Sequence, residues 1–351
     1  MTTQQVGEPE VLVRTEGSVG RLTLNRPRAI NALNASMVDL LGRTIDAWAV
    51  DPSITAVLID GAGDRGLCAG GDVVAMYRDA VSGGMGTLDF WRSEYLLNAA
   101  INSFPKPYVA LMDGIVMGGG VGISAHGSHR IVTERSRVAM PETGIGFVPD
   151  VGGIFLLAHA PGETGTHLGL TGGQMDGADA IALGFADHFV PSSALDSFTA
   201  AVVADGVDEA VLKYSETPHQ SKVFAARTWI DGVYAADTVE QITERLERRT
   251  EPEAQAAATA LAGRSPVALK ATLRSLREAR ETDALEDVLD QDFRAVSHAL
   301  RTHDLAEGIR AQVVDKDRNP RWSPAALAEV DEAMVDAYFA PVDRELGLGR
   351  A

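Results

Sequence analysis

The chain of 351 residues has a single cysteine and few basic side chains, and both shortages exclude classes of protein. Cys68 has no second cysteine with which to form an intramolecular disulfide, and a zinc site made of several cysteines is excluded as well. The 31 Lys and Arg residues are outnumbered by 49 Asp and Glu residues, giving a formal net charge of −18. Nucleic acids and anionic membrane surfaces are bound through patches of Lys and Arg. We therefore expect no nucleic-acid partner and no membrane partner.

Long apolar segments are also absent. The longest glycine-rich apolar stretch, at 114–129, has 16 residues, six of them glycine. A membrane-spanning helix needs about 20 apolar residues, so this stretch is too short. The first ten residues, MTTQQVGEPE, lack the basic and apolar regions of a signal peptide. Together with the single cysteine, these absences predict a cytoplasmic protein.

The composition of the chain changes near residue 195. Before it, strand and helix patterns alternate. Strands are expected at 11–13 and 19–24, which should pair as a hairpin across 16–18, and at 55–59, 107–112, 131–132 and 138–140. Helices are expected at 36–48 and 88–104. Ser36 is the expected N-cap of the first helix. After residue 195 we expect helices at 239–249, 254–261, 266–281, 284–301 and 324–339. The alternation predicts an α/β core domain over residues 1–195, followed by a helical C-terminal domain over 196–351.

Two glycine-rich turns follow expected strands: CAGGD at 68–72 and MGGGVG at 117–122. Glycine lets a backbone N–H approach a ligand closely, and two such groups can form an oxyanion hole for an acyl carbonyl. Tight turns and helix packing explain such runs equally well. The segment GVGISA at 120–125 also matches a dinucleotide-binding pattern, but a lone match is weak and leaves a nicotinamide oxidoreductase as a distant alternative. A serine nucleophile elbow is excluded, because His126 stands where that motif requires glycine.

Three carboxylates are candidates for chemistry. Glu142 and Asp150 lie eight residues apart in a segment rich in Gly and Pro, and two acids in one pocket can divide proton transfer between them. Asp150 could instead cap the apolar stretch that follows it. Glu94 lies in an amphipathic helix, where a solvent-facing position is the default, and Cys68 is expected to pack as a small hydrophobe. The eight His residues show no metal-ligand spacing, so we expect no metal. These residues favour an acyl-transfer or carbonyl-polarising enzyme.

The order of these motifs resembles the crotonase (enoyl-CoA hydratase/isomerase) superfamily. The matching segments are NRP at 25–27, NALN at 31–34, AGGD at 69–72, GGG at 118–120 and Pro141-Glu142. Longer segments resemble the 3-hydroxyisobutyryl-CoA hydrolases within it: EYLLN at 94–98, KPYVAL at 106–111, PETGIG at 141–146, PDVGG at 149–153, and, near the C-terminus, HD at 303–304, EGIR at 307–310, DKD at 315–317 and PRW at 320–322. The resemblance extends from about residue 10 to about residue 330.

The resemblance implies a ββα spiral core, a helical C-terminal region and acyl-CoA substrates, with no cofactor beyond the CoA of the substrate. Gly71 and Gly119 would supply the N–H groups of the oxyanion hole. Glu142 would be the catalytic carboxylate, activating water or attacking the carbonyl directly. Asp150 would bind the 3-hydroxyl of the substrate or assist proton transfer, and Glu94 would line the same pocket. Members of the superfamily often form trimers or dimers of trimers, so a homo-oligomer is also implied.

The resemblance further separates hydrolysis from hydration. Hydratases of the superfamily carry a second glutamate two residues past the glycine triplet, where this chain has Gly122, and usually lack an acid at the place of Asp150. We therefore expect hydrolysis of 3-hydroxyisobutyryl-CoA, a step of valine breakdown. An enoyl-CoA hydratase or isomerase is the alternative, and a silent acyl-CoA-binding protein is a third. Arg26 and Arg28 are the cations nearest to the CoA-phosphate region of the family.

Overall fold

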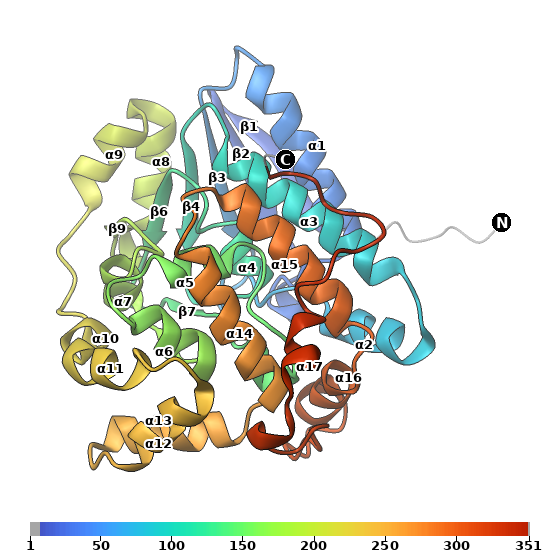
Figure 1. The fold of residues 1–351 in the computed structure, drawn as a ribbon. Helices are drawn as coiled ribbons and strands as arrows, with labels where there is room; N and C mark the ends of the chain where they lie inside the picture. The colour runs from blue at the N-terminus through green and yellow to red at the C-terminus, as the bar shows by residue number, and fades with distance from the viewer. Residues whose placement is uncertain (1–7, 350–351) are drawn as a thin grey trace.

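The computed structural model of the chain describes residues 8–349 (Figure 1). The expectation of no signal peptide was drawn from residues 1–10, and residues 1–7 lie outside the described residues. A six-stranded sheet has the order β1-β2-β3-β4-β6-β9. Its strands are β1 (Val11–Glu16), β2 (Val19–Leu24), β3 (Ala56–Gly61), β4 (Tyr108–Met112), β6 (His129–Val132) and β9 (His188–Phe189). The β1–β2 pair is antiparallel, which confirms the expected hairpin, and the other pairs are parallel.

A second sheet of three strands lies beside the first. It contains β5 (Ile115–Met117), β7 (Arg137–Ala139) and β8 (Gln174–Met175). The chain places β4 in the large sheet, β5 in the small one, β6 in the large one again and β7 in the small one. Repeated pairs of strands that alternate between two sheets make the ββα spiral, so the expected fold class is confirmed. The loops that follow β3 and β5 carry the two glycine-rich turns.

The helices of the first half pack around these sheets. They are α1 (Ala35–Val50), α2 (Val73–Ser82), α3 (Gly86–Asn102), α4 (Gly119–Gly122), α5 (Gly153–Ala158), α6 (Thr164–Thr171) and α7 (Gly177–Ala182), with 3-10 turns at Pro27–Ala29, Glu142–Ile145 and Ser192–Ala194. The expected cap of α1 is wrong: Asn34, not Ser36, accepts the hydrogen bond from the N–H of Met37 at 3.0 Å. The Ser36 hydroxyl bonds to Glu10 and Asn34 instead, because the helix begins at Ala35, two residues earlier than a Ser36 cap would place it.

The second half of the chain is helical, as expected. Its helices are α8 (Leu195–Asp205), α9 (Val207–Tyr214), α10 (Lys222–Ala225), α11 (Arg227–Tyr234), α12 (Val239–Glu247), α13 (Pro252–Ala262), α14 (Pro266–Ala279), α15 (Leu285–Ala299), α16 (His303–Ile309) and α17 (Glu332–Asp336), with a π-helical turn at Arg310–Val314 and a 3-10 turn at Leu327–Glu329. The helix expected at 324–339 is wrong. Val330 is extended there and its carbonyl accepts from Lys270, and Asp331 caps a new short helix.

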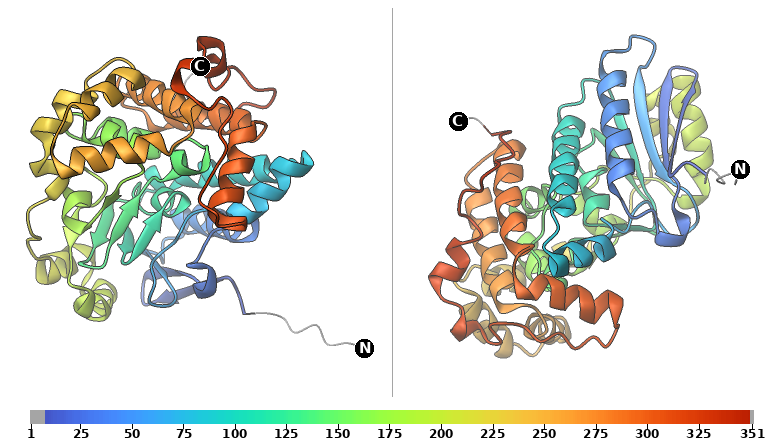
Figure 2. Two further views of the ribbon diagram at one scale, coloured as in Figure 1. Left: turned by 90° about the horizontal axis from the view of Figure 1, so that it is seen from below. Right: turned by 90° about the vertical axis from the view of Figure 1, so that its right-hand side faces the viewer.

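The C-terminal helices pack directly on the core of the first half (Figure 2). One hydrophobic cluster contains side chains from both halves of the chain, among them Trp91 and Phe147, which stack at 5.3 Å, and Phe293 of α15. The opposite side of the large sheet is covered by α8 and α9, through Phe198, Val202 and neighbouring apolar side chains. The boundary proposed at residue 195 therefore stays a prediction about organisation, because the hydrophobic packing continues across it.

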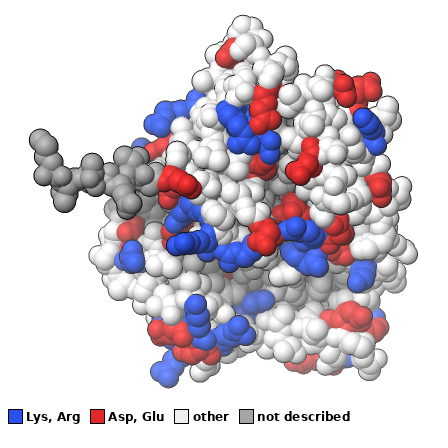
Figure 3. All heavy atoms as spheres, turned by 180° about the vertical axis from the view of Figure 1, so that it is seen from behind, with Lys and Arg blue, Asp and Glu red and all other residues white. Residues whose placement is uncertain are grey.

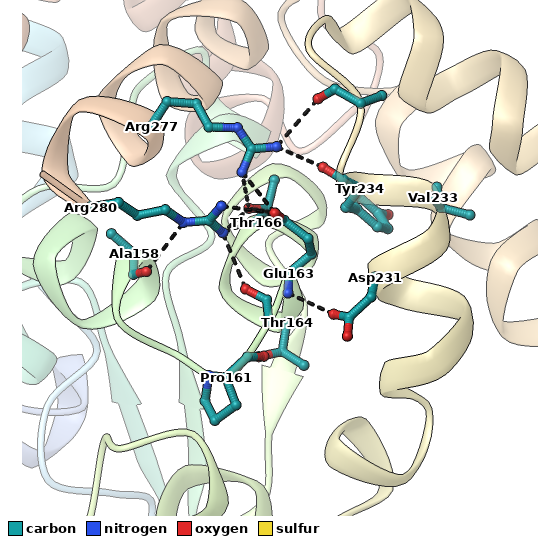
Figure 4. Close-up of polar contacts among 12 residues, drawn as sticks. Ala158, Pro161, Glu163, Thr164, Thr166, Asp231, Val233, Tyr234, Arg277 and Arg280 are labelled. Carbon is teal, nitrogen blue, oxygen red and sulfur yellow. Dashed lines mark hydrogen bonds and ion pairs between the residues drawn. The ribbon is translucent and has the colours of Figure 1, made fainter.

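A partly buried ion-pair network joins α14 to the first half of the chain (Figure 4). Glu163, which precedes α6 and is 12% exposed, accepts hydrogen bonds from both Arg277 and Arg280 of α14. Arg277 also donates to the carbonyl of Tyr234 in α11. Burial raises the pKa of Glu163, but the hydrogen bonds from Arg280, Thr166 and Arg277 together outweigh this effect. The pKa of Glu163 is therefore below its usual value. The network holds the C-terminal end of α14 against the start of α6.

Candidate active site

A cavity of about 370 Å³ lies where the two glycine-rich turns meet the C-terminal helices. Its wall is formed by the two turns and by the segment after β7, and residues from beyond position 260 complete it. The lining residues are Ala69, Gly70, Gly71, Val73, Met76, Trp91, Glu94, Met117, Gly118, Gly119, Pro141, Glu142, Gly144, Ile145, Phe147, Asp150, Arg264, Gln312 and Val313. All five residues proposed from the sequence, Gly71, Glu94, Gly119, Glu142 and Asp150, therefore lie on one cavity.

The two glycine turns present backbone N–H groups side by side. Leu33 forms hydrogen bonds with Gly70 and Asp72, so the N–H of Gly71 between them points away from that contact. Neither this N–H nor that of Gly119 donates to an atom of residues 8–349. A methyl group built on Gly70 would lie 3.7 Å from the nitrogen of Gly119. Two N–H groups on adjacent turns that donate no hydrogen bond within the described residues can stabilise the negative oxygen of a tetrahedral intermediate.

Glu94 lies inside the protein, and the expectation that it faces solvent is wrong. Only 2% of the Glu94 surface is exposed, because α15 and the cavity wall cover this side of α3. Trp91, Tyr95 and Asn98 lie on the same buried helix face at i−3, i+1 and i+4. One carboxylate oxygen of Glu94 has no hydrogen-bond partner among the described residues. A methyl group built on Gly119 would meet that oxygen at 2.4 Å, so the carboxylate lies against the second glycine turn.

Glu142 begins the 3-10 turn at Glu142–Ile145, directly after Pro141. Only 7% of the residue is exposed. Its Oε1 would lie 3.0 Å from a methyl group on Gly118, which places the carboxylate beside the same glycine turn as Glu94. Its Oε2 is buried and has no hydrogen-bond partner within residues 8–349. An unpartnered buried carboxylate oxygen in a cavity wall is available to a ligand or a water molecule.

Asp150 faces the cavity and does not cap a helix. The helix α5 begins at Gly153, and its N-cap residue is Gly152 with no side-chain cap. The Asp150 carboxylate instead accepts a hydrogen bond from the hydroxyl of Tyr95, with Oδ2 2.6 Å from the phenolic oxygen. Asp150 is 5% exposed and Tyr95 is fully buried. The capping role considered for Asp150 is therefore wrong.

Burial changes the proton affinity of all three carboxylates. Loss of hydration raises the pKa of Glu142 well above its usual range, and the charge of Asp150 raises it further. The pKa of Glu94 is raised for the same two reasons. Burial also raises the pKa of Asp150, whereas the hydrogen bond from Tyr95 lowers it in part. Buried acids with raised pKa values in a cleft are typical of acid–base catalysis.

Three residues of the site were not singled out from the sequence, although Tyr95 lies within the EYLLN segment at 94–98. Tyr95 adjoins Glu94, but its bond to Asp150 joins residues 55 positions apart. Arg264 and Gln312 reach the cavity from the C-terminal helices. Arg264 donates to the carbonyl of Thr171, and no carboxylate within residues 8–349 lies at ion-pair distance from it. Its buried Nε has no partner among those residues, which leaves a cation on the cavity wall.

Neither cation named from the sequence, Arg26 or Arg28, lines the cavity, and Arg26 is already paired. Arg26 contacts the carboxylates of Glu10 and Asp72 at 3.2 Å and 3.4 Å and donates to the carbonyl of Ala32. On the face opposite to that of Figure 1, Lys and Arg side chains gather beside a hollow, with Asp and Glu among them (Figure 3). Basic and acidic side chains are thus mixed on this face. Local groups of cations are what a phosphate-bearing ligand requires in an acidic protein.

Gly122 lies where a side chain has no space. A methyl group built on it would be 2.8 Å from the amide nitrogen of Asn98 and 2.8 Å from Cβ of Val151. A second catalytic carboxylate at this position would displace the turn that carries Asp150. The acids of the cavity are therefore the three buried carboxylates Glu94, Glu142 and Asp150, with glycine at position 122.

Residues 19–339 match the model of a protein family described as enoyl-CoA hydratase/isomerase. The chain belongs to this family. The expected relationship to the crotonase superfamily is therefore confirmed. The chain is 40% identical to the mitochondrial 3-hydroxyisobutyryl-CoA hydrolase of Gallus gallus, over 95% of this chain and 89% of that protein. It is 39% identical to 3-hydroxyisobutyryl-CoA hydrolase 1 of Arabidopsis thaliana, over 98% of this chain and 95% of that protein.

Solved structures of this family share the fold and carry other names. The chain is 54% identical to a carnitinyl-CoA dehydratase from Mycobacterium thermoresistibile, with a TM-score of 0.94 over 97% of this chain and 98% of that one. It is 41% identical to an enoyl-CoA hydratase from Rhodobacter sphaeroides, with a TM-score of 0.91 over 95% of this chain and 98% of that one. The fold is thus shared by proteins named for hydrolysis and for dehydration, and the residues of the cavity must distinguish the two reactions.

No helix among the described residues is long and apolar enough to cross a membrane. Within residues 8–349, no group of three or more His, Cys, Asp or Glu side chains could hold a metal ion. Cys68 is buried beside the first glycine turn, and its Sγ contacts the backbone of Gly70, as a small packed side chain should. Burial raises the pKa of its thiol to about 12, so Cys68 is no nucleophile at neutral pH.

Proposed function

We propose that this protein hydrolyses 3-hydroxyisobutyryl-CoA to 3-hydroxyisobutyrate and free CoA, a step of valine breakdown. One observation carries the proposal: two buried carboxylates, Glu142 and Asp150, line the same cavity as Gly71 and Gly119. The N–H groups of these two glycines donate no hydrogen bond within residues 8–349. The relatives named 3-hydroxyisobutyryl-CoA hydrolase support the choice of substrate. The packed position of Gly122 argues against the second glutamate that hydration needs.

The glycine turns polarise the thioester. The N–H groups of Gly71 and Gly119 donate to the carbonyl oxygen, whose negative charge grows as the carbon becomes tetrahedral. Each donor of this kind stabilises the transition state by about 2.7–4 kcal/mol. No side chain is needed at either position, and a Cβ on Gly119 would collide with Glu94. The polarised carbonyl carbon is then open to attack.

Glu142 supplies the nucleophile and Asp150 holds the acyl group. The ionised carboxylate of Glu142 either removes a proton from water, which attacks the carbonyl carbon, or attacks that carbon itself to form an anhydride that water then cleaves. In both routes the C–S bond breaks, and the sulfur leaves as CoA thiolate and takes up a proton. When water attacks directly, it supplies the new carboxyl oxygen of the product. In the anhydride route that oxygen comes from Glu142, and water attacks the glutamyl carbonyl and restores the Glu142 carboxylate. Asp150, oriented by Tyr95, accepts the 3-hydroxyl of the substrate. Single turnover in H₂¹⁸O distinguishes the routes, because only the anhydride route places ¹⁸O in Glu142.

Three further assignments belong to the proposal. CoA enters as part of the substrate, so no separate cofactor takes part. The protein acts in the cytoplasm, although the relatives from animals are named as mitochondrial. It assembles as a homo-oligomer, a trimer or a hexamer. Size-exclusion chromatography with light scattering tests the last point directly.

The first experiment measures thiol release and loss of enoyl absorbance in parallel. The purified protein receives 3-hydroxyisobutyryl-CoA, crotonyl-CoA or carnitinyl-CoA, the last because of the name of the structure from Mycobacterium thermoresistibile. We expect thiol release from the first substrate and no change in the enoyl signal from the other two. The variant Glu142→Gln keeps the fold and loses about 10²–10⁴-fold in thiol release, the range for removal of a general base. Enoyl turnover without thiol release would replace hydrolysis by hydration.

A further inference from the structure

The turn that carries Asp150 has an unfavourable backbone conformation. Val151 and Gly152, the next two residues, have φ angles of +52° and +72°. A β-branched residue at positive φ is rare, and such strain costs on the order of 1–3 kcal/mol. The turn keeps this shape only if its surroundings hold it there. Two buried polar side chains outside the turn do so.

The first is Asp292, in the middle of α15 of the C-terminal region. Its Oδ2 accepts a hydrogen bond from the N–H of Gly152 at 3.0 Å, a contact that spans 140 residues of the chain. The second is His126, whose Nε2 lies 2.8 Å from the carbonyl oxygen of Val151. Because a carbonyl oxygen only accepts, this ring nitrogen carries the hydrogen. Asp292 and His126 thus hold the N–H and the C=O of the peptide group between Val151 and Gly152, one residue after Asp150.

Packing alone does not explain why an acidic side chain lies at position 292. It is 2% exposed and its neighbours on the same helix face, Leu289, Phe293 and Val296, are buried apolar residues. An apolar side chain would avoid the cost of burying a carboxylate. Asp292 also does not line the cavity, so it touches no substrate. Its polar contact is with the turn that directs Asp150 toward Tyr95.

We propose that Asp292 is a positioning residue for the reaction: by accepting the N–H of Gly152 it holds the Asp150 carboxylate against Tyr95 and toward the acyl group. His126 holds the same turn from its carbonyl side. This inference rests on the proposed function, because it assigns Asp150 a role in that reaction. It also explains why the C-terminal helices are part of the catalytic unit: α15 sets the geometry of a residue that comes 142 positions earlier. Burial and the charge of Asp150 raise the pKa of Asp292, as expected for acids held close together.

The test compares Asp292→Leu with Asp292→Asn. Leucine removes the acceptor, whereas the asparagine carbonyl still accepts from Gly152. We expect Asp292→Leu to lower kcat for 3-hydroxyisobutyryl-CoA by about 10–100-fold, the range for a small misplacement of a reacting group, with KM changed less than about threefold. Asp292→Asn should restore kcat to within about fivefold of the wild type, since it rebuilds the same hydrogen bond. If the leucine variant does not fold, Asp292→Ala takes its place.

Two controls separate positioning from a loss of stability. Asp179→Leu removes another buried acid, 4% exposed, that accepts hydrogen bonds from Ser221 and Val223 away from the cavity. It should lower the melting temperature and leave kcat of the folded protein unchanged. In an Asp150→Asn background, Asp292→Leu should cost less than about threefold, because the residue that it positions is already inactive. Equal losses from Asp292→Leu in the two backgrounds, or equal losses from the Leu and Asn variants, would overturn the proposal.

A crystal structure of Asp292→Leu gives a readout that needs no activity. The Tyr95 hydroxyl and Asp150 Oδ2 are 2.6 Å apart in the wild-type protein. We expect this distance to open beyond hydrogen-bond range in Asp292→Leu and to be kept in Asp292→Asn. An unchanged 2.6 Å contact in the leucine variant would refute the positioning role. If the wild-type protein releases no thiol, the proposed function fails, and the crystal structures still decide whether Asp292 sets the position of Asp150.

Discussion

The hydroxyl of Tyr95 donates a 2.6 Å hydrogen bond to Oδ2 of Asp150, and both side chains are buried. Tyr95 comes from the middle of α3, and Asp150 lies on the turn before α5. The bond opposes the effect of burial on Asp150, because it stabilises the ionised carboxylate. It also fixes which Asp150 oxygen faces the cavity. Two elements that are distant in the chain thus define one catalytic carboxylate.

Removal of this hydroxyl should weaken catalysis without disturbing the fold. In Tyr95→Phe the Asp150 carboxylate loses a charged hydrogen bond, which is worth about 1.5–3 kcal/mol. We expect kcat/KM for 3-hydroxyisobutyryl-CoA to fall by about 10–100-fold. The ring keeps its edge-to-face contact with Phe293 at 6.2 Å, so the melting temperature should change little. Wild-type turnover in a folded Tyr95→Phe variant would show that Asp150 needs no orienting partner.

The pH dependence of hydrolysis should report the pair of acids. Attack requires ionised Glu142, and burial followed by the charge of Asp150 raises the pKa of this group. The rate should therefore rise with pH over a range above that of a free glutamate. Asp150→Asn removes the neighbouring negative charge, lowers the pKa of Glu142 and shifts the acidic limb of kcat/KM to lower pH. A limb that stays in place in Asp150→Asn would mean that Asp150 does not influence the group that titrates.

The stability of the protein should depend on pH through Glu94. Its pKa is raised in the folded state, first by burial and then by Asp150, so the folded protein holds this proton more tightly than the unfolded chain. The stability that this proton contributes is fully present below the pKa of the unfolded chain and is lost as pH rises through the folded value. Glu94→Gln should therefore melt at a higher temperature than the wild type at pH 7.5. The difference should shrink toward pH 4.5, and thermal unfolding at the two pH values checks it.

The tight packing around Gly122 predicts that alanine is harmful there and tolerated at Gly232. Gly122→Ala places a methyl group 2.8 Å from Asn98 and from Val151, which costs about 1–3 kcal/mol and moves the turn that carries Asp150. Both the melting temperature and kcat should fall. Gly232 in α11 has no atom within 4 Å of the added methyl group, so Gly232→Ala should leave activity unchanged and not lower stability. Equal behaviour of the two variants would contradict the tight packing at Gly122.

Local patterns account for the features that were predicted correctly. The β1–β2 hairpin, the glycine turns and Glu142 lie in short segments in which each residue acts on near neighbours. Boundaries set by single side chains were less certain: Asn34 and Ser36 both suit an N-cap, and the backbone decides between them. The helix expected at 324–339 failed because Lys270, 60 residues away, binds the carbonyl of an extended Val330. The helix pattern alone favours a solvent-facing Glu94, because that helix carries no sign of α15, which covers it; the family resemblance is what implies that Glu94 lines the pocket.

The α/β core, the two glycine turns and the candidate acids could be predicted from the sequence, because strand alternation and glycine runs are local properties of the chain. The spiral topology came from the resemblance of the motif order to a known family. The tertiary structure alone decided how those acids work together. The bonds of Asp150 to Tyr95 and of Gly152 to Asp292 span 55 and 140 residues, and Arg264 reaches the cavity from the far half of the chain. Such contacts depend on how helices pack, and packing brings together side chains that no spacing in the sequence relates.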